Sequence, residues 1–141
     1  MDFHNSVMKK YKPLFEGNDF VGKKLLLKNM EQAPNMGSRF GQDVEPSGFF
    51  SLLYNEKYNK HMLDLPNYKL YSYNFKNPLI IDVTEDAVQW KKDMAVQYKA
   101  KGKQLTKKLI SSGYDAIITY DYKYKETGEI IILDTRGLQE V

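Results

Sequence analysis

One long helical pattern with strand patterns on both sides constrains the fold of this chain more than any other feature. Between Thr84 and Gly113, apolar residues recur at steps of three, four or seven positions, as on one face of an amphipathic helix. The stripe consists of Ala87, Trp90, Met94, Tyr98, Leu105 and Leu109. Thr84 is predicted to be the N-cap and Gly113 the C-terminal stop, with a kink or interruption at Gly102. We expect the stripe to pack in the core.

Several shorter segments have the patterns of strands. Short apolar or alternating runs bounded by glycine, proline or polar residues are typical of strands. These runs lie at 23–29, 48–54, 68–75, 77–83, 113–121 and 128–134. The last two are expected to form a hairpin through "YKYKETG". This order predicts a single α+β domain over residues 1–141, with one long helix packed on a mostly antiparallel sheet.

The remaining segments are expected to be helical or irregular. Residues 1–20 have apolar residues at helical intervals and predict a short N-terminal helix. Residues 30–47 contain two prolines, two glycines and no period, so they predict a long loop, and such loops are often functional or disordered. Residues 55–62 predict one short helical stretch.

Composition narrows the possible chemistry. No window is as apolar as a membrane span, and the start lacks a secretory signal, so we expect a cytoplasmic protein without membrane contact. The absence of cysteine excludes disulfides and thiolate nucleophiles. His4 and His61 have no partner at helical or hairpin spacing, so we expect neither a metal site nor a Ser-His-Asp triad. The net charge of +3 permits an anionic partner but is weaker than a dedicated nucleic-acid-binding footprint.

The order of motifs in the C-terminal half is distinctive. "NPLIIDV", a helix, "GYDAIITYD" and "GEIIILDTRGLQEV" follow one another from Asn77 to the end. This half resembles the small ADP-ribosyltransferase-like domains common in phages and mobile elements, and its last strand is also similar to the glutamate-bearing strand of poly-ADP-ribose polymerases. The resemblance implies a split sheet, NAD as co-substrate and a protein or other macromolecule as acceptor. For a phage-encoded protein it implies host takeover in the host cytoplasm.

The resemblance makes Glu129 the expected catalytic carboxylate. In the family, the glutamate of the last strand holds a ribose hydroxyl and helps to orient or deprotonate the acceptor. Cleavage of the nicotinamide–ribose bond builds positive charge on the sugar, which a carboxylate stabilises. Strand alternation predicts that Glu129 shares a face with Ile131 and Leu133. The alternative is a solvated charge directly after a turn at Thr127–Gly128.

The resemblance also indicates residues that would bind NAD in the N-terminal half. Where the family has an arginine or histidine on its first strand, this chain has Lys28, followed by Asn29. Lys28 offers a point charge to a phosphate or ribose, or is a strand-end lysine in solvent. Arg39 is an independent candidate for the pyrophosphate, because a guanidinium pairs with phosphate through two hydrogen bonds. It is otherwise a solvated loop arginine.

The second family motif is a Gly-x-Tyr-Phe stretch or a Ser-Thr-Ser strand, and "SGFFSLL" resembles it in part through Gly48, Phe49, Phe50 and Ser51. Phe49 and Phe50 are expected to point to opposite faces of their strand. At most one of them therefore lines a nicotinamide pocket, and both are equally suited to the core. Ser51 is a candidate catalytic residue that bonds the ribose or the carboxamide, or it satisfies a backbone group.

The sequence thus favours an NAD-dependent mono-ADP-ribosyltransferase, a glycosyltransferase in the broad sense. One alternative keeps the fold without the chemistry, because the missing arginine or histidine is typical of an inactive protein that binds or inhibits a partner. Another alternative is a single-stranded nucleic-acid-binding domain. It rests on the alternation of lysine and tyrosine in "YKLYSYNFK" and "YDYKYK".

Overall fold

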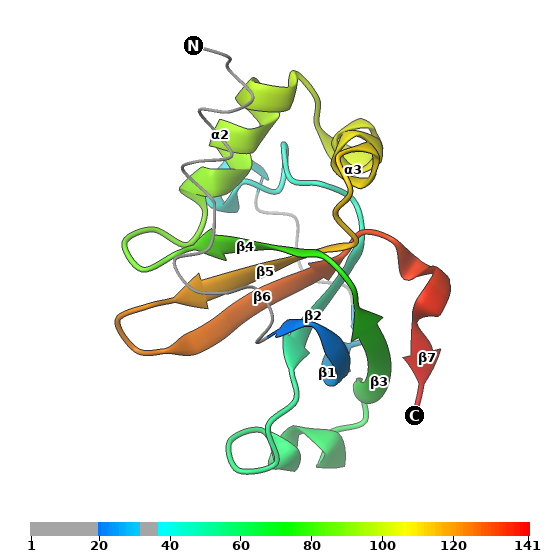
Figure 1. The fold of residues 1–141 in the computed structure, drawn as a ribbon. Coiled ribbons are helices and arrows are strands. Elements are labelled where there is room, and N and C mark those ends of the chain that lie inside the picture. Colours follow the sequence, from blue (N-terminus) through cyan, green and yellow to red (C-terminus); the bar gives the residue numbers. More distant parts are fainter. Residues whose placement is uncertain (1–19, 32–36) are drawn as a thin grey trace.

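The computed structural model describes residues 20–31 and 37–141, which form one α+β domain (Figure 1). Its strands are β1 (Gly22–Asn29), β2 (Phe49–Leu53), β3 (Tyr68–Phe75), β4 (Pro78–Asp82), β5 (Ala116–Asp121), β6 (Glu126–Ile132) and β7 (Gln139–Glu140). The α-helices are α2 (Gln89–Tyr98) and α3 (Gly102–Ser111), and the 3-10 helices are η2 (Gly37–Phe40), η3 (Lys60–Asp64) and η4 (Thr135–Gly137). The helix predicted over residues 1–20 lies outside the described residues, apart from Phe20.

The strands form a single sheet in the order β4-β5-β6-β2-β1-β3-β7. All neighbours pair antiparallel except β4 and β5, so the predicted mostly antiparallel sheet is confirmed. The two α-helices lie between β4 and β5 in the chain and supply the crossover that parallel neighbours require. β2 pairs with β6 through its first residues and with β1 through Leu52 and Leu53, so β2 links the two halves of the sheet.

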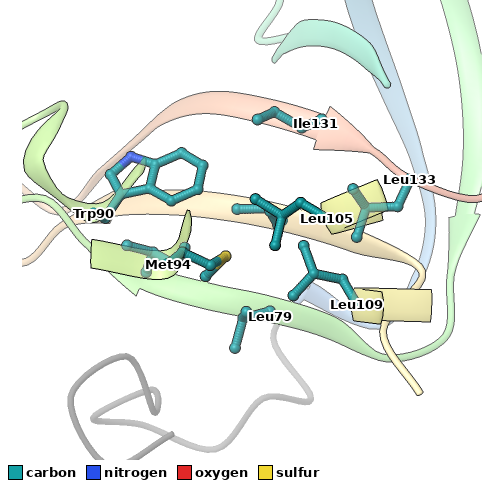
Figure 2. Packing of buried hydrophobic residues seen from close by; sticks show 9 residues of the cluster. Leu79, Trp90, Met94, Leu105, Leu109, Ile131 and Leu133 are labelled. Atoms are coloured by element: carbon teal, nitrogen blue, oxygen red, sulfur yellow. The ribbon is translucent and has the colours of Figure 1, made fainter. Parts of the chain in front are cut away.

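The two faces of β4, β5 and β6 bury different partners. On one face, α2 and α3 cover the sheet (Figure 1). Figure 2 shows buried side chains that pack between these helices and the sheet. This helix-side core includes Leu79, Trp90, Met94, Leu105, Leu109, Ile131 and Leu133. On the other face, residues of β1 and β3 pack against Ile80, Ile118 and Ile130. Burial of each large apolar side chain stabilises the fold by about 1.5–3 kcal/mol.

The helical pattern predicted from Thr84 to Gly113 is wrong in its start, because α2 begins at Gln89. Thr84 is bonded to Asp82 and Tyr122 instead of capping a helix, and the Asp86 carboxylate accepts the backbone N–H groups of Val88 and Gln89, where α2 begins. α2 ends at Tyr98 and is followed by Lys99 in the left-handed conformation, and α3 begins at Gly102, so the predicted interruption is confirmed. Ala87 precedes α2 and is exposed, whereas Trp90, Met94, Leu105 and Leu109 are buried as predicted.

The segment predicted as a long loop is attached to the helices in its second half. The backbone N–H of Gly102 donates to the Glu45 carbonyl at 3.0 Å, and the Thr106 hydroxyl donates to the Ser47 carbonyl at 2.6 Å. Pro46 and Gly102 also form an isolated β-bridge. These contacts place Glu45 at the edge of the helix layer.

Candidate functional site

The structure makes neighbours of the strands that carry the predicted site. Glu129 lies on β6, the phenylalanines and Ser51 lie on β2, and Lys28 lies on β1, in the spatial order β6-β2-β1. The hairpin turn occupies residues 122–125 and β6 begins at Glu126, so Glu129 is inside the strand. The prediction of a Thr127–Gly128 turn is therefore wrong. Strand pairing continues past that point because those two residues form part of β6.

Glu129 faces the helix layer. Ile131 and Leu133 belong to the helix-side core and Ile130 to the opposite one, which confirms the predicted alternation. The Glu129 side chain is 38% exposed. A carboxylate at this position is at the margin of the core, with one side still open to solvent.

A buried lysine on α2 holds this carboxylate. Lys91 Nζ lies 3.2 Å from Glu129 Oε1 and 2.7 Å from Glu45 Oε2, and the Lys91 side chain is only 6% exposed. We call Glu45, Lys91 and Glu129 the Lys91 cluster. A buried ammonium without a partner is strongly unfavourable, whereas two carboxylates compensate it. The cluster therefore fixes the position of the Glu129 side chain relative to α2 and to the segment that carries Glu45.

Aromatic rings and a glycine complete the surroundings of the Lys91 ammonium. Lys91 Nζ lies 5.9 Å from the centroid of the Phe50 ring and 5.8 Å from that of Trp90, which is within the range of cation–π attraction. Gly41 packs on the lysine stem, because a Cβ built there would lie 3.0 Å from Lys91 Cδ. A larger residue at Gly41 would push the chain away from Lys91, so the close approach requires glycine.

Burial changes the pKa values of two charged groups near Glu129. Burial raises the pKa of Glu45, and the hydrogen bond from Lys91 opposes that change. Burial lowers the pKa of Lys28, and the negative charge of Glu129 opposes it. The charge of Glu129 on β6 therefore acts on the pKa of Lys28 on β1, with β2 between the two strands.

Lys28 is anchored to the backbone where β1 and β2 separate. The two strands pair only through Leu26–Leu53 and Leu27–Leu52. Beyond these pairs, Lys28 Nζ donates to the Phe50 carbonyl at 2.8 Å and lies 4.8 Å from the centroid of the Phe49 ring. Lys28 is therefore not the solvated strand-end lysine of the alternative interpretation.

The structure does not bring Ser51 to Glu129. Ser51 is opposite Ile130 in the β2–β6 pairing, so its side chain points to the other face of the sheet. It is 7% exposed, and its hydroxyl donates to the Ile130 carbonyl at 3.3 Å. This contact is the backbone-satisfying role that was the alternative to catalysis.

The rest of the β2 motif divides between the two faces. Phe50 packs against the helix-side core, whereas Phe49 contacts Tyr71 edge to face at 4.9 Å on the other side, as predicted for consecutive strand residues. A Cβ built on Gly48 would lie 2.5 Å from the Ile132 carbonyl oxygen. Close approach of β6 explains this glycine without any ligand.

Asn29 and Arg39 have local contacts. The Asn29 side-chain oxygen accepts from the backbone of Glu31 and from the Asn67 amide, both at 2.9 Å. Arg39 is exposed on η2, with its guanidinium 5.4 Å from the centroid of the Phe40 ring. Neither residue belongs to the Lys91 cluster.

Sequence reasoning did not identify Lys91 or Glu45. A signal for Lys91 was present, because it lies three residues before Met94 and therefore close to the buried stripe of its helix. No comparable signal exists for Glu45, which lies 46 positions from Lys91 along the chain.

Comparisons with known proteins do not assign a family: no family model, no curated protein and no solved structure matches this chain. Within residues 20–31 and 37–141, no three or more histidine, cysteine, aspartate or glutamate residues are grouped to hold a metal ion. No helix of the described part is long and apolar enough to cross a membrane.

Proposed function

We propose that this protein is an NAD-dependent mono-ADP-ribosyltransferase in which Glu129 is the catalytic carboxylate. One observation carries the proposal. Glu129 is fixed by buried Lys91 and yet 38% exposed, on a strand next to the one that bears Phe50. A carboxylate that contacts a sugar must be both oriented and accessible, and Glu129 meets both conditions.

The proposed reaction uses the negative charge of Glu129 twice. The bond between nicotinamide and C1′ of the ribose breaks, and its electron pair leaves with nicotinamide. Positive charge then develops on the sugar and is stabilised by the carboxylate. An acceptor nucleophile forms the new bond to C1′ and loses a proton to Glu129. Lys91 acts as a positioning residue, because its ammonium holds the carboxylate.

The test is transfer of label from labelled NAD to the macromolecules of a cell lysate. Glu129→Gln keeps the size of the side chain but removes its charge, so we expect a rate loss on the order of 10²-fold or more. Glu126→Gln is the matched control, since Glu126 is exposed at the start of the same strand. Circular dichroism establishes that both variants are folded. Equal transfer by Glu129→Gln and wild type would contradict the assignment.

NAD binding by the wild type is measured separately by calorimetry. Absence of binding at high micromolar protein would exclude both a transferase and a simple NAD glycohydrolase.

A second candidate function is an ADP-ribosyltransferase-like protein that binds or inhibits a partner without catalysis. Its support is Lys28, which replaces the arginine or histidine of the family and bonds the Phe50 carbonyl. This function predicts no transfer of label and an equal, small effect of the Glu129 and Glu126 substitutions in a partner-binding assay.

A further inference from the structure

A groove with aromatic walls lies at the turn end of the β5–β6 hairpin. Its volume is about 670 Å³, and its lining includes Phe20, Tyr58, Tyr120 and Tyr124. The walls come from two separate segments, because Tyr58 follows β2 whereas Tyr124 belongs to the turn between β5 and β6. Phe20 and Tyr120 meet edge to face with 5.7 Å between their ring centroids.

Two tyrosine rings of this groove are open to solvent. Tyr58 is 68% exposed and Tyr124 is 65% exposed, far more than the ring residues of the core. An exposed ring contributes little to folding, but its face is available for stacking on a planar ligand. Base stacking on such rings is a principal source of affinity for single-stranded nucleic acid.

Lysines accompany the exposed rings. Lys57 Nζ lies 5.4 Å from the centroid of the Tyr58 ring, and Lys123 Nζ lies 5.4 Å from that of Tyr124. Lys125 lines the groove itself, where Glu126 is the acidic lining residue. All three lysines are exposed. This arrangement of ammonium groups complements a chain of phosphates that passes beside stacked bases.

The backbone of Lys125 adds a further observation. Its φ angle is +54°, in the left-handed region where glycine is preferred. Replacement by glycine would therefore relieve the backbone and remove one ammonium from the groove wall. Lys125→Gly therefore tests the role of the charge in binding without destabilising the turn.

We propose that this groove binds a single-stranded nucleic acid, with bases stacked on Tyr58 and Tyr124 and phosphates paired with the surrounding lysines. A duplex would not fit this role, because its base faces are covered by their neighbours. The groove lining does not include any member of the Lys91 cluster. The proposal therefore goes beyond the proposed transferase activity and does not depend on it.

The experiment measures fluorescence anisotropy of an end-labelled 12-nucleotide single strand of mixed sequence as protein is added. We expect saturable binding that weakens with salt, with a slope of log affinity against log salt near −2 for about three phosphate contacts. Two competitors are tested separately: a duplex of the same sequence, and uridine monophosphate. Each should displace the labelled strand poorly.

Variants locate the binding in the groove. Tyr58→Ala and Tyr124→Ala should each weaken binding roughly 5- to 100-fold, whereas Tyr124→Phe should retain it, since stacking does not need the hydroxyl. Lys125→Gly should weaken binding and flatten the salt dependence by about 0.7. Lys99→Gly is its matched control, because Lys99 also has a positive φ, of 52°, but lies at the end of α2.

Absence of binding at 100 µM protein in low salt would overturn the proposal. So would wild-type affinity in both alanine variants, or displacement of the strand by uridine monophosphate or NAD at concentrations equal to that of the strand. Glu129→Gln should bind the strand as wild type does. A Glu129→Gln variant that loses transfer from NAD but still binds the strand would agree with both proposals. Each proposal can therefore fail without the other.

Discussion

The Lys91 cluster and the tyrosine groove use lysine in opposite ways. Lys91 is almost fully buried between two carboxylates, next to the rings of Phe50 and Trp90. At the groove, Lys57 and Lys123 are not lining residues but lie beside the lining rings of Tyr58 and Tyr124, which are themselves mostly exposed. The charge of Lys91 is therefore needed by the protein's own structure, whereas the groove lysines remain available to a ligand. Substitution of Lys91 should therefore lower stability, whereas substitution of the groove lysines should weaken ligand binding.

The largest expected effect is that of Lys91→Met. This substitution removes the ammonium but keeps most of the stem, so Glu45 and Glu129 remain partly buried without compensation. We expect the free energy of unfolding to fall by on the order of 3–5 kcal/mol. Urea denaturation followed by circular dichroism measures this change. Lys92→Met is the control, because Lys92 is exposed on the same helix and should change stability by less than about 0.5 kcal/mol. If Lys91→Met and Lys92→Met lowered the free energy of unfolding equally, the structure would not need the buried charge of Lys91 any more than an exposed lysine.

A smaller effect, of opposite sign, is expected for Lys125→Gly in the groove. A left-handed backbone costs a non-glycine residue about 1–2 kcal/mol, and the extra freedom of glycine in the unfolded chain offsets part of this gain. The variant should be as stable as wild type or more stable by up to about 1 kcal/mol in the same denaturation experiment. A clear loss of stability would show that the Lys125 side chain holds the hairpin turn.

The smallest effect is expected at an exposed ion pair. Arg136 bonds Asp134 through two nitrogens, at 2.9 and 2.7 Å, and these contacts lower the pKa of Asp134 to about 2 from 3.8. Because the pKa is lowered in the folded state, the pair stabilises the protein above about pH 4, and this contribution is lost as pH falls towards 2. In Arg136→Gln, the Asp134 pKa should rise towards its ordinary value in a carboxyl NMR titration. An unchanged Asp134 pKa in Arg136→Gln would mean that the backbone N–H of residue 136, and not the guanidinium, lowers it.

The strands were predictable because their patterns are local. Alternation in "YKLYSYNF" and the apolar runs around Leu27 and Ile80 give strands at the expected places. The start of α2 was not predictable from capping preference alone, since Thr84 bonds across to Tyr122 and the Asp86 carboxylate accepts the backbone N–H groups of Val88 and Gln89. Such a choice depends on tertiary contacts that no short window contains.

The site was predictable only in part. Glu129 was a candidate because of its position in the motif order, and its catalytic role stays a prediction, whereas its face on the strand was predicted correctly from alternation. Ser51 was a candidate because "SGFFSLL" resembles the second family motif, yet Ser51 lies one step from Phe50 along the strand and its side chain points to the opposite face. Lys91 and Glu45 meet across 46 residues, so their pairing depends on how the segment after η2 packs on the helices.

The ends of the strand order affect how the sheet meets other molecules. β7 has two residues, and β4 begins at Pro78, whose nitrogen has no hydrogen to donate. Short edge strands and edge prolines give a neighbouring chain few backbone groups with which to pair. Across the described residues, the sheet is therefore poorly suited to growth by strand addition. The isoleucine-rich strands β5 and β6 lie inside the sheet and form neither of these edges.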